Sequence, residues 1–124
     1  MVGNEELKLG VGNEEAITLK PAIVKIERLE IQEVGTKKGK KVVCFAKHPD
    51  NPELIQISSV KYENKGKLEI AGLWVNKDSK GLIRKGSALA VFLNIYGAKT
   101  IEGINNKEIP TIQDDKGYLV FKAY

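Results

Sequence analysis

The chain has very few of the residues that build metal centres and disulfides. Its 124 residues include a single cysteine, Cys44, and a single histidine, His48. One cysteine excludes an intramolecular disulfide and a thiolate zinc cluster, and it indicates a reducing compartment. His48 lies in a proline-flanked loop without the further ligands that a metal needs, so we expect a solvated loop residue. Cys44 lies within an apolar alternation and is expected to pack as a small hydrophobic side chain. The sequence predicts no metal and no other cofactor.

Long apolar runs and the short motifs of common enzymes are also missing. No run of about 18 apolar residues is present to cross a bilayer, and the acidic residues 1–6 do not fit a targeting segment. There is no Gly-x-Ser-x-Gly elbow. Residues 35–41 look like a phosphate-binding loop, but only three residues separate the glycines and Lys41 follows Lys40. The motif requires four residues there and a Ser or Thr after its lysine. We expect a cytoplasmic protein that contacts no membrane and is not an enzyme.

Charge is unevenly distributed along a chain of otherwise ordinary composition. Hydrophobic residues make up 42% and charged residues 29%, as in a single globular domain. Residues 1–20 carry a net charge of −2, which leaves +6 for residues 21–124. An acidic mobile arm on a basic domain is common among nucleic-acid binders, because the arm can compete for the basic surface. The alternative is a basic protein with no particular partner. Abundant lysine, glutamate and isoleucine indicate a thermophilic source.

Hydrophobic periodicity predicts a mainly β fold for residues 21–124. The first alternation, over 22–32, slips by one residue near Glu27 and Arg28, which predicts a bulge or bend in a long strand. Further strands are expected over 41–47, 54–62, 67–76, 108–112 and 117–124. One capping helix is predicted over 87–97, with Ser87 as N-cap and Gly97 as the left-handed residue after its end. A small antiparallel barrel with one helix fits this order, and the OB-fold is the natural candidate.

Lysines and aromatic rings alternate on several of these strands. Residues 36–47 contain five lysines and no acidic residue. Rings on a sheet can stack bases while neighbouring ammonium groups meet phosphates. For Trp74, which lies between Leu73 and Val75, and for Phe45, a place in the core is the alternative. The predicted nucleic-acid-binding residues are Lys37, Lys38, Lys40, Lys41, Phe45, Lys47, Trp74, Tyr118, Lys122 and Tyr124.

A second candidate is an anion site just before the predicted helix. Arg84, Lys85 and Ser87 place two cations and a hydroxyl where free backbone N–H groups favour an anion. The alternative is a helix cap with charged neighbours.

The last third of the chain resembles a family. The segments 86–97, 104–109 and 116–121 contain a helix that ends in Tyr96-Gly97, a turn at Asn106-Lys107-Glu108, and a closing strand that begins Gly117-Tyr118. This layout, over residues 82–124, is similar to OB-fold single-strand DNA-binding and replication-accessory proteins of phages and archaea. Those proteins often have glycine where this chain has Asn106. The resemblance implies an oligonucleotide surface on the barrel sheet.

Three functions follow as hypotheses. The first is non-enzymatic binding of single-stranded nucleic acid, with DNA ranked ahead of RNA, through a basic, aromatic-bearing sheet surface. The second is a protein-interaction or assembly module that forms a homo-oligomer or binds a protein partner through a strand edge or the arm. The third is an enzyme subunit that binds a small phosphorylated ligand at residues 84–87, although no base, nucleophile or metal set accompanies those residues.

Overall fold

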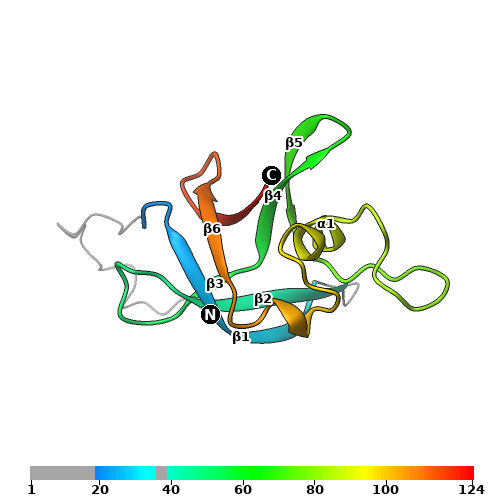
Figure 1. Cartoon of the computed structure of the whole chain (residues 1–124), viewed down its shortest axis with the longest axis horizontal. Helices are drawn as coiled ribbons and strands as arrows, with labels where there is room; N and C mark the ends of the chain where they lie inside the picture. Colours follow the sequence, from blue (N-terminus) through cyan, green and yellow to red (C-terminus); the bar gives the residue numbers. More distant parts are fainter. Residues whose placement is uncertain (1–18, 36–38) are drawn as a thin grey trace, which may run out of the picture.

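The fold is mainly β, as the periodicity predicts (Figure 1). The computed structural model describes residues 19–35 and 39–124, so most of the predicted acidic arm, together with Lys37 and Lys38, lies outside the described residues. The described part contains seven strands, one short α-helix and one 3₁₀ turn at Glu102–Ile104. The elements are β1 (Ile23–Val34), β2 (Gly39–Lys47), β3 (Ile55–Ile57), β4 (Ser59–Asn64), β5 (Lys67–Gly72), α1 (Ala88–Ile95), β6 (Glu108–Gln113) and β7 (Leu119–Ala123).

The strands form one mixed sheet in the order β3-β2-β1-β6-β7-β4-β5. Every neighbouring pair is antiparallel except β4 and β7, which run parallel with Val60 opposite Phe121. The ladders leave β3 and β5 as the two ends of this order, and no ladder joins them to close the sheet. The sheet is mixed, and the prediction that all its strands are antiparallel is wrong for β4 and β7. A parallel pair requires a long crossover connection, and here the chain between β4 and β7 passes through α1 and β6. The direction of a strand could not be predicted, because the alternation of apolar residues along a strand is the same in either direction. Only Ser58 separates β3 from β4.

The predicted irregularity in the first strand is confirmed. Ile26 lies opposite Ala46, but Arg28 lies opposite Phe45, so the register of β1 on β2 shifts between Ile26 and Arg28. This bulge exchanges the two faces of β1. Ile26 is buried in the core before the bulge, and Leu29 packs against the core after it.

The helix forms where its caps predict it. The Ser87 hydroxyl accepts a hydrogen bond from the Ala90 N–H at 3.2 Å, and Gly97 adopts a left-handed φ of 69° after the helix end. The buried stripe of α1 contacts β4, β5 and β7. Within it, the Phe92 ring stacks on Phe121 of β7 with centroids 4.9 Å apart. The Tyr96 hydroxyl donates to the Lys122 carbonyl, and burial raises the pKa of this phenol.

The core lies on one side of the curved sheet, under α1. It is built from the inward residues of β1, β2, β4, β6 and β7 and from the buried residues of α1. Figure 1 shows the β4–β5 hairpin extending beyond the rest of the sheet. The opposite, outward side of these strands carries the lysines and rings of the candidate interface described below.

His48 is a structural residue, and the prediction of a solvated loop histidine is wrong. The ring is fully buried. Its Nδ1 accepts from the Asp50 N–H at 3.0 Å and its Nε2 lies 2.8 Å from the Lys20 carbonyl. Both ring nitrogens are therefore engaged by backbone groups from two different segments. His48 therefore ties the segment that precedes β1 to the loop that follows β2.

Replacing His48 tests this role. His48→Ala removes the partner of the Lys20 carbonyl and of the Asp50 N–H and creates a cavity at a fully buried side chain. We therefore expect a loss of roughly 2–4 kcal/mol in the free energy of unfolding. His48→Asn keeps an acceptor near Nδ1 and should lose less. Chemical denaturation followed by circular dichroism measures both. A change below about 0.5 kcal/mol for His48→Ala, the range of ordinary surface substitutions, would show that the ring does not hold the two segments together.

Cys44 packs in the core as expected, and burial raises the pKa of its thiol to about 12. The unfolded thiol titrates near pH 8.5. Between about pH 8.5 and pH 12 the folded state therefore holds a proton that the unfolded state has lost. Below this window the thiol has no effect on the pH dependence, and within it stability falls as pH rises.

The alkaline loss of stability should depend on Cys44. From pH 7 to pH 10 the free energy of unfolding of the parent should fall by about 2 kcal/mol more than that of Cys44→Ala. Denaturant titrations of both proteins at the two pH values measure this difference. Parallel pH profiles for the two proteins would contradict it.

Candidate nucleic-acid interface

The outward face of β2 presents the predicted lysines, but not a free Phe45 ring. Val42, Cys44 and Ala46 point into the core, so Lys41, Phe45 and Lys47 point outward, as alternation predicts. Phe45 is nevertheless only 7% exposed. The Arg28 guanidinium lies over its ring, 3.8 Å from the centroid. The prediction that Phe45 stacks bases is corrected: its outward face is already covered by a cation from β1.

Arg28 was missed in the sequence, although a signal was present. The bulge after Ile26 reverses the faces of β1, and this places Arg28 opposite Phe45 on the outward side. Arg28 also pairs with Glu30 at 3.4 Å. The predicted slip implies that Arg28 changes face, and this change of face is the sequence signal that places Arg28 on the same side as Phe45.

Trp74 lies on the surface beside Lys41. Leu73 is buried, and the next residue, Trp74, turns outward and remains 37% exposed. Two backbone hydrogen bonds hold this segment against β2: Val42 N–H to the Leu73 carbonyl at 2.9 Å and Val75 N–H to the Lys40 carbonyl at 2.8 Å. Lys41 and Trp74 are thereby paired, and the Lys41 Nζ lies 5.2 Å from the indole centroid. Of the two alternatives for Trp74, the structure places it outside the core.

Two glycines make room for the indole. A Cβ on Gly39 would lie 3.1 Å from the Trp74 Cζ3, and a Cβ on Gly72 would lie 2.8 Å from the Trp74 Nε1. The Gly72 Cβ would also meet the Lys41 Cε at 2.8 Å. Because both glycines lack side chains, the indole and the lysine stem lie directly on the backbone of β2 and β5. This close approach holds the ring in position before any ligand arrives.

The outward side of β5, β4 and β7 continues from this point to the C-terminus. Residues directly opposite each other on paired strands share a face. Ile70 of β5 lies opposite Lys61 of β4, and Lys61 lies opposite Lys122 of β7. The Lys122 Nζ is 5.0 Å from the centroid of the Tyr124 ring, which is exposed. We call this row the outer strip; its members are Lys41, Trp74, Gly72, Ile70, Lys61, Lys122 and Tyr124.

The outer strip joins two groups of predicted residues, and its central lysine was missed. Lys41 with Trp74 and Lys122 with Tyr124 are far apart in the sequence, and Lys61 connects them. Strand alternation places Lys61 outward, but only the pairing of β4 with both β5 and β7 places it between the other two lysines. Within the described residues the only ion pair is Arg28–Glu30. The three lysines of the strip therefore have no carboxylate partner there.

Other predicted residues lie away from the outer strip. Tyr118 is exposed at the β6–β7 turn, where its N–H donates to Asp114 Oδ1 at 2.9 Å. It lies about 20 Å along an extended strand from Tyr124. Lys47 donates to the carbonyls of Asn51 and Pro52 at the far end of β2. Lys40 is exposed, but strand alternation places it on the other face of β2 from Lys41.

The predicted anion site at the start of α1 has its groups engaged elsewhere. The Ser87 hydroxyl caps the helix, and the Arg84 Nη2 donates to the Lys77 carbonyl at 3.3 Å. Lys85 lines a separate groove. The three residues do not converge on one point through any of these contacts.

Comparisons with known proteins add no assignment. Neither protein-family models, nor curated proteins, nor solved structures match this chain. Among residues 19–35 and 39–124, no helix is long and apolar enough to span a membrane. The same residues hold no group of three or more His, Cys, Asp or Glu side chains placed to hold a metal ion.

Gly72→Ala should displace the Trp74 ring. The new Cβ would overlap the indole edge and the Lys41 stem, so both side chains must shift. Trp74 is the only tryptophan, and intrinsic fluorescence therefore reports on this site directly. We expect a red-shifted emission and stronger acrylamide quenching. Gly103→Ala is the matched control, because its Cβ would lie no closer than 3.4 Å to any neighbour and far from Trp74 in sequence. Identical spectra for Gly72→Ala and the parent would contradict the close packing.

Proposed function

We propose that this chain binds single-stranded nucleic acid, with DNA ranked ahead of RNA, without catalysing a reaction. One observation carries the proposal: three cation–aromatic pairs, Arg28–Phe45, Lys41–Trp74 and Lys122–Tyr124, lie on the outward side of the sheet. Proteins that bind single strands combine rings that stack on bases with cations that follow the backbone. The Lys41–Trp74 and Lys122–Tyr124 pairs provide both groups within the reach of one nucleotide, whereas in the Arg28–Phe45 pair the guanidinium covers the ring.

The outer strip is the proposed path of the strand. Trp74 and Tyr124 present rings that are partly open to solvent, and each has a lysine beside it. Lys61 lies between them and would meet an intervening phosphate. A stacked base contributes roughly 1–3 kcal/mol, so two rings support measurable binding without base-specific contacts.

The outward face of β1 and β2 is a second part of the same proposal. Phe45 lies four residues along β2 from Lys41, a distance of about 13 Å. The Arg28 guanidinium lies over Phe45 and its side chain is 55% exposed, and planar guanidinium groups also stack on bases. In this arrangement Arg28 takes the role that the sequence assigned to the Phe45 ring.

The strand order is compatible with an OB-like barrel as the finer description of the fold. If β3 and β4 are counted as one strand bent at Ser58, the pairs form a ring: β1-β2-β3/β4-β7-β6-β1. The Lys41–Trp74 bridge adds a link between β2 and the end of β5. In OB-folds the second and third strands and the adjacent loops bind oligonucleotides. In this description the β6–β7 turn with Tyr118 would be one of those loops.

Two buried side chains support the non-enzymatic reading. The raised pKa keeps the Cys44 thiol protonated at neutral pH, and the thiolate is the nucleophilic form. Both ring nitrogens of His48 are engaged by the backbone. Neither side chain can reach a ligand on the outer strip.

Titration with a labelled oligothymidine should show binding that weakens as salt rises. Trp74→Ala should weaken it by about 5- to 150-fold, the equivalent of one lost stacked base. Lys61→Gln should weaken it several-fold and lower the salt slope by about 0.7, as expected for one lost phosphate contact. Fluorescence anisotropy at several salt concentrations gives both quantities.

Lys80→Gln is the matched control, because Lys80 is exposed in a loop away from the outer strip. It should leave both affinity and salt slope unchanged. Absence of binding at low salt would remove the proposal. If Lys80→Gln and Lys61→Gln weaken oligothymidine binding equally, the binding is a general attraction between a basic protein and a polyanion, and the proposed site on the outer strip is wrong. A matched oligouridine distinguishes RNA from DNA.

A second candidate function, assembly through a strand edge, has one supporting observation. β5 is an edge strand of the sheet, and its side chains Leu68 and Ile70 are exposed. An edge of this kind can accept a strand from another chain. Light scattering at low and high salt separates the two functions, because edge pairing gives an oligomer that persists when salt weakens nucleic-acid binding.

A further inference from the structure

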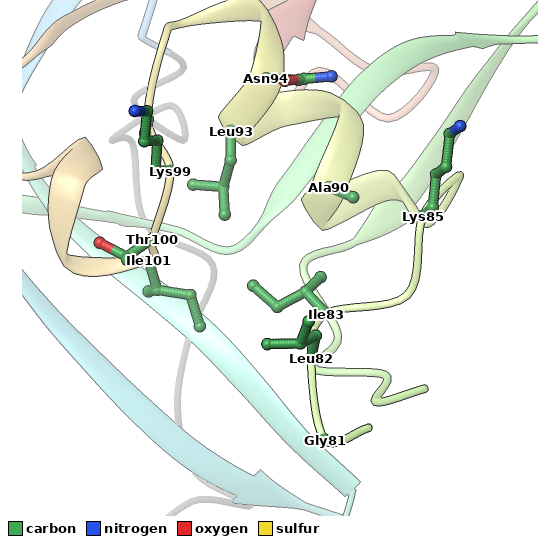
Figure 2. Close-up of a pocket in the computed structure, with 11 residues that line it drawn as sticks. Gly81, Leu82, Ile83, Lys85, Ala90, Leu93, Asn94, Lys99, Thr100 and Ile101 are labelled. Carbon is green, nitrogen blue, oxygen red and sulfur yellow. The ribbon is translucent and has the colours of Figure 1, made fainter. Parts of the chain in front are cut away.

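A groove beside α1 lies apart from the outer strip. It has a volume of about 590 Å³, within the range of ligand-binding pockets. Three segments form its walls: the loop that precedes the helix, the helix itself, and the segment that leads to the 3₁₀ turn (Figure 2). The lining residues are Gly81, Leu82, Ile83, Lys85, Ala90, Leu93, Asn94, Ala98, Lys99, Thr100 and Ile101.

The floor of the groove is apolar and open. In Figure 2 the side chains of Ile83, Leu93 and Ile101 point toward a common space from three different segments. Leu82 joins them and is 63% exposed. Ala90 lines the groove from α1 with only a methyl group, so the groove stays open beside the helix at this position. A large exposed leucine beside an apolar hollow indicates a surface that another molecule can cover.

The rim of the groove is positive. Lys85 and Lys99 lie on opposite sides of the apolar floor in Figure 2. No aspartate or glutamate is among the lining residues. Neither lysine belongs to an ion pair within the described part of the chain. The groove therefore has apolar contacts in the centre and two unpartnered cations at the edges.

We infer that this groove binds an acidic amphipathic segment of a partner protein. Apolar side chains of the segment would fill the space between Ile83, Leu93 and Ile101, and flanking carboxylates would meet Lys85 and Lys99. This is the arrangement in which an amphipathic peptide occupies a groove through spaced anchors. Charge complementarity then selects an acidic segment over a basic one.

Two other occupants fit the groove less well. A nucleic-acid strand would stack its bases on rings, and the lining contains no aromatic residue. A second copy of this chain would bring another basic body, since residues 21–124 carry a net charge of +6. An acidic segment suits both the apolar floor and the positive rim.

The test is selection of random peptides of about twelve residues, displayed on phage, against the full-length protein. We expect recovered peptides to carry Leu, Ile, Met or Phe anchors flanked by Asp or Glu. Synthetic copies should bind the parent, and each of Lys85→Glu, Lys99→Glu and Ala90→Glu should weaken them at least tenfold. Ala90→Glu places a carboxylate in the groove while keeping a good helix former. Lys80→Glu, next to the groove but outside its lining, is the control and should bind as the parent does.

Melting curves first establish that each variant is folded. Failure to recover any peptide, recovery of basic or uncharged peptides, or binding that Ala90→Glu leaves intact would each overturn the inference. Oligothymidine binding should be unchanged in Lys99→Glu. If that variant loses oligothymidine binding as strongly as Lys61→Gln does, the groove belongs to the nucleic-acid surface instead. A dimer of the parent that Ala90→Glu dissociates would identify the occupant as a second copy.

Discussion

The pairing of residues 73–75 with β2 is the contact on which the candidate surface depends. Two backbone hydrogen bonds, Val42 to Leu73 and Val75 to Lys40, carry the chain from the end of β5 onto the start of β2. Through them Leu73 enters the core and Trp74 turns outward beside Lys41. Because backbone groups at this depth must be paired, the position of the ring is set by the main chain. Without this pairing, the β5 and β2 parts of the outward surface would be separate patches.

The candidate surface depends on two positions without side chains, Gly39 and Gly72. Gly39 and Gly72 let an indole and a lysine stem lie against the backbone, where any Cβ would interfere. The bulge in β1 has a related effect, because it exchanges the faces of the strand and places Arg28 over Phe45. Both devices arrange rings and cations before a ligand arrives, which reduces the ordering that binding requires.

The molecule presents two surfaces of different chemistry on opposite parts of its fold. The outward side of the sheet combines rings with lysines, whereas the groove beside α1 combines aliphatic side chains with lysines. Rings are suited to planar bases, and an aliphatic hollow is suited to branched or long apolar side chains. The two proposals place a nucleic-acid strand and a protein segment on separate sets of residues, with positive charge common to both.

Local patterns in the sequence located the strands, the helix and the faces of most strands, but they did not show the break at Ser58 between β3 and β4 or the end of β5 at Gly72. Ser87 and Gly97 mark the helix because caps act through neighbouring backbone groups, and the slip near Arg28 marks the bulge because a strand has a period of two. What tertiary structure alone decided was which strands are neighbours: the parallel pairing of β4 with β7, the place of Lys61 between Lys122 and Ile70, and the burial of His48. Contacts between residues distant in the sequence depend on packing of the whole chain, and no local periodicity records them. The sequence therefore determined which side chains face outward, and the fold decided which of them meet.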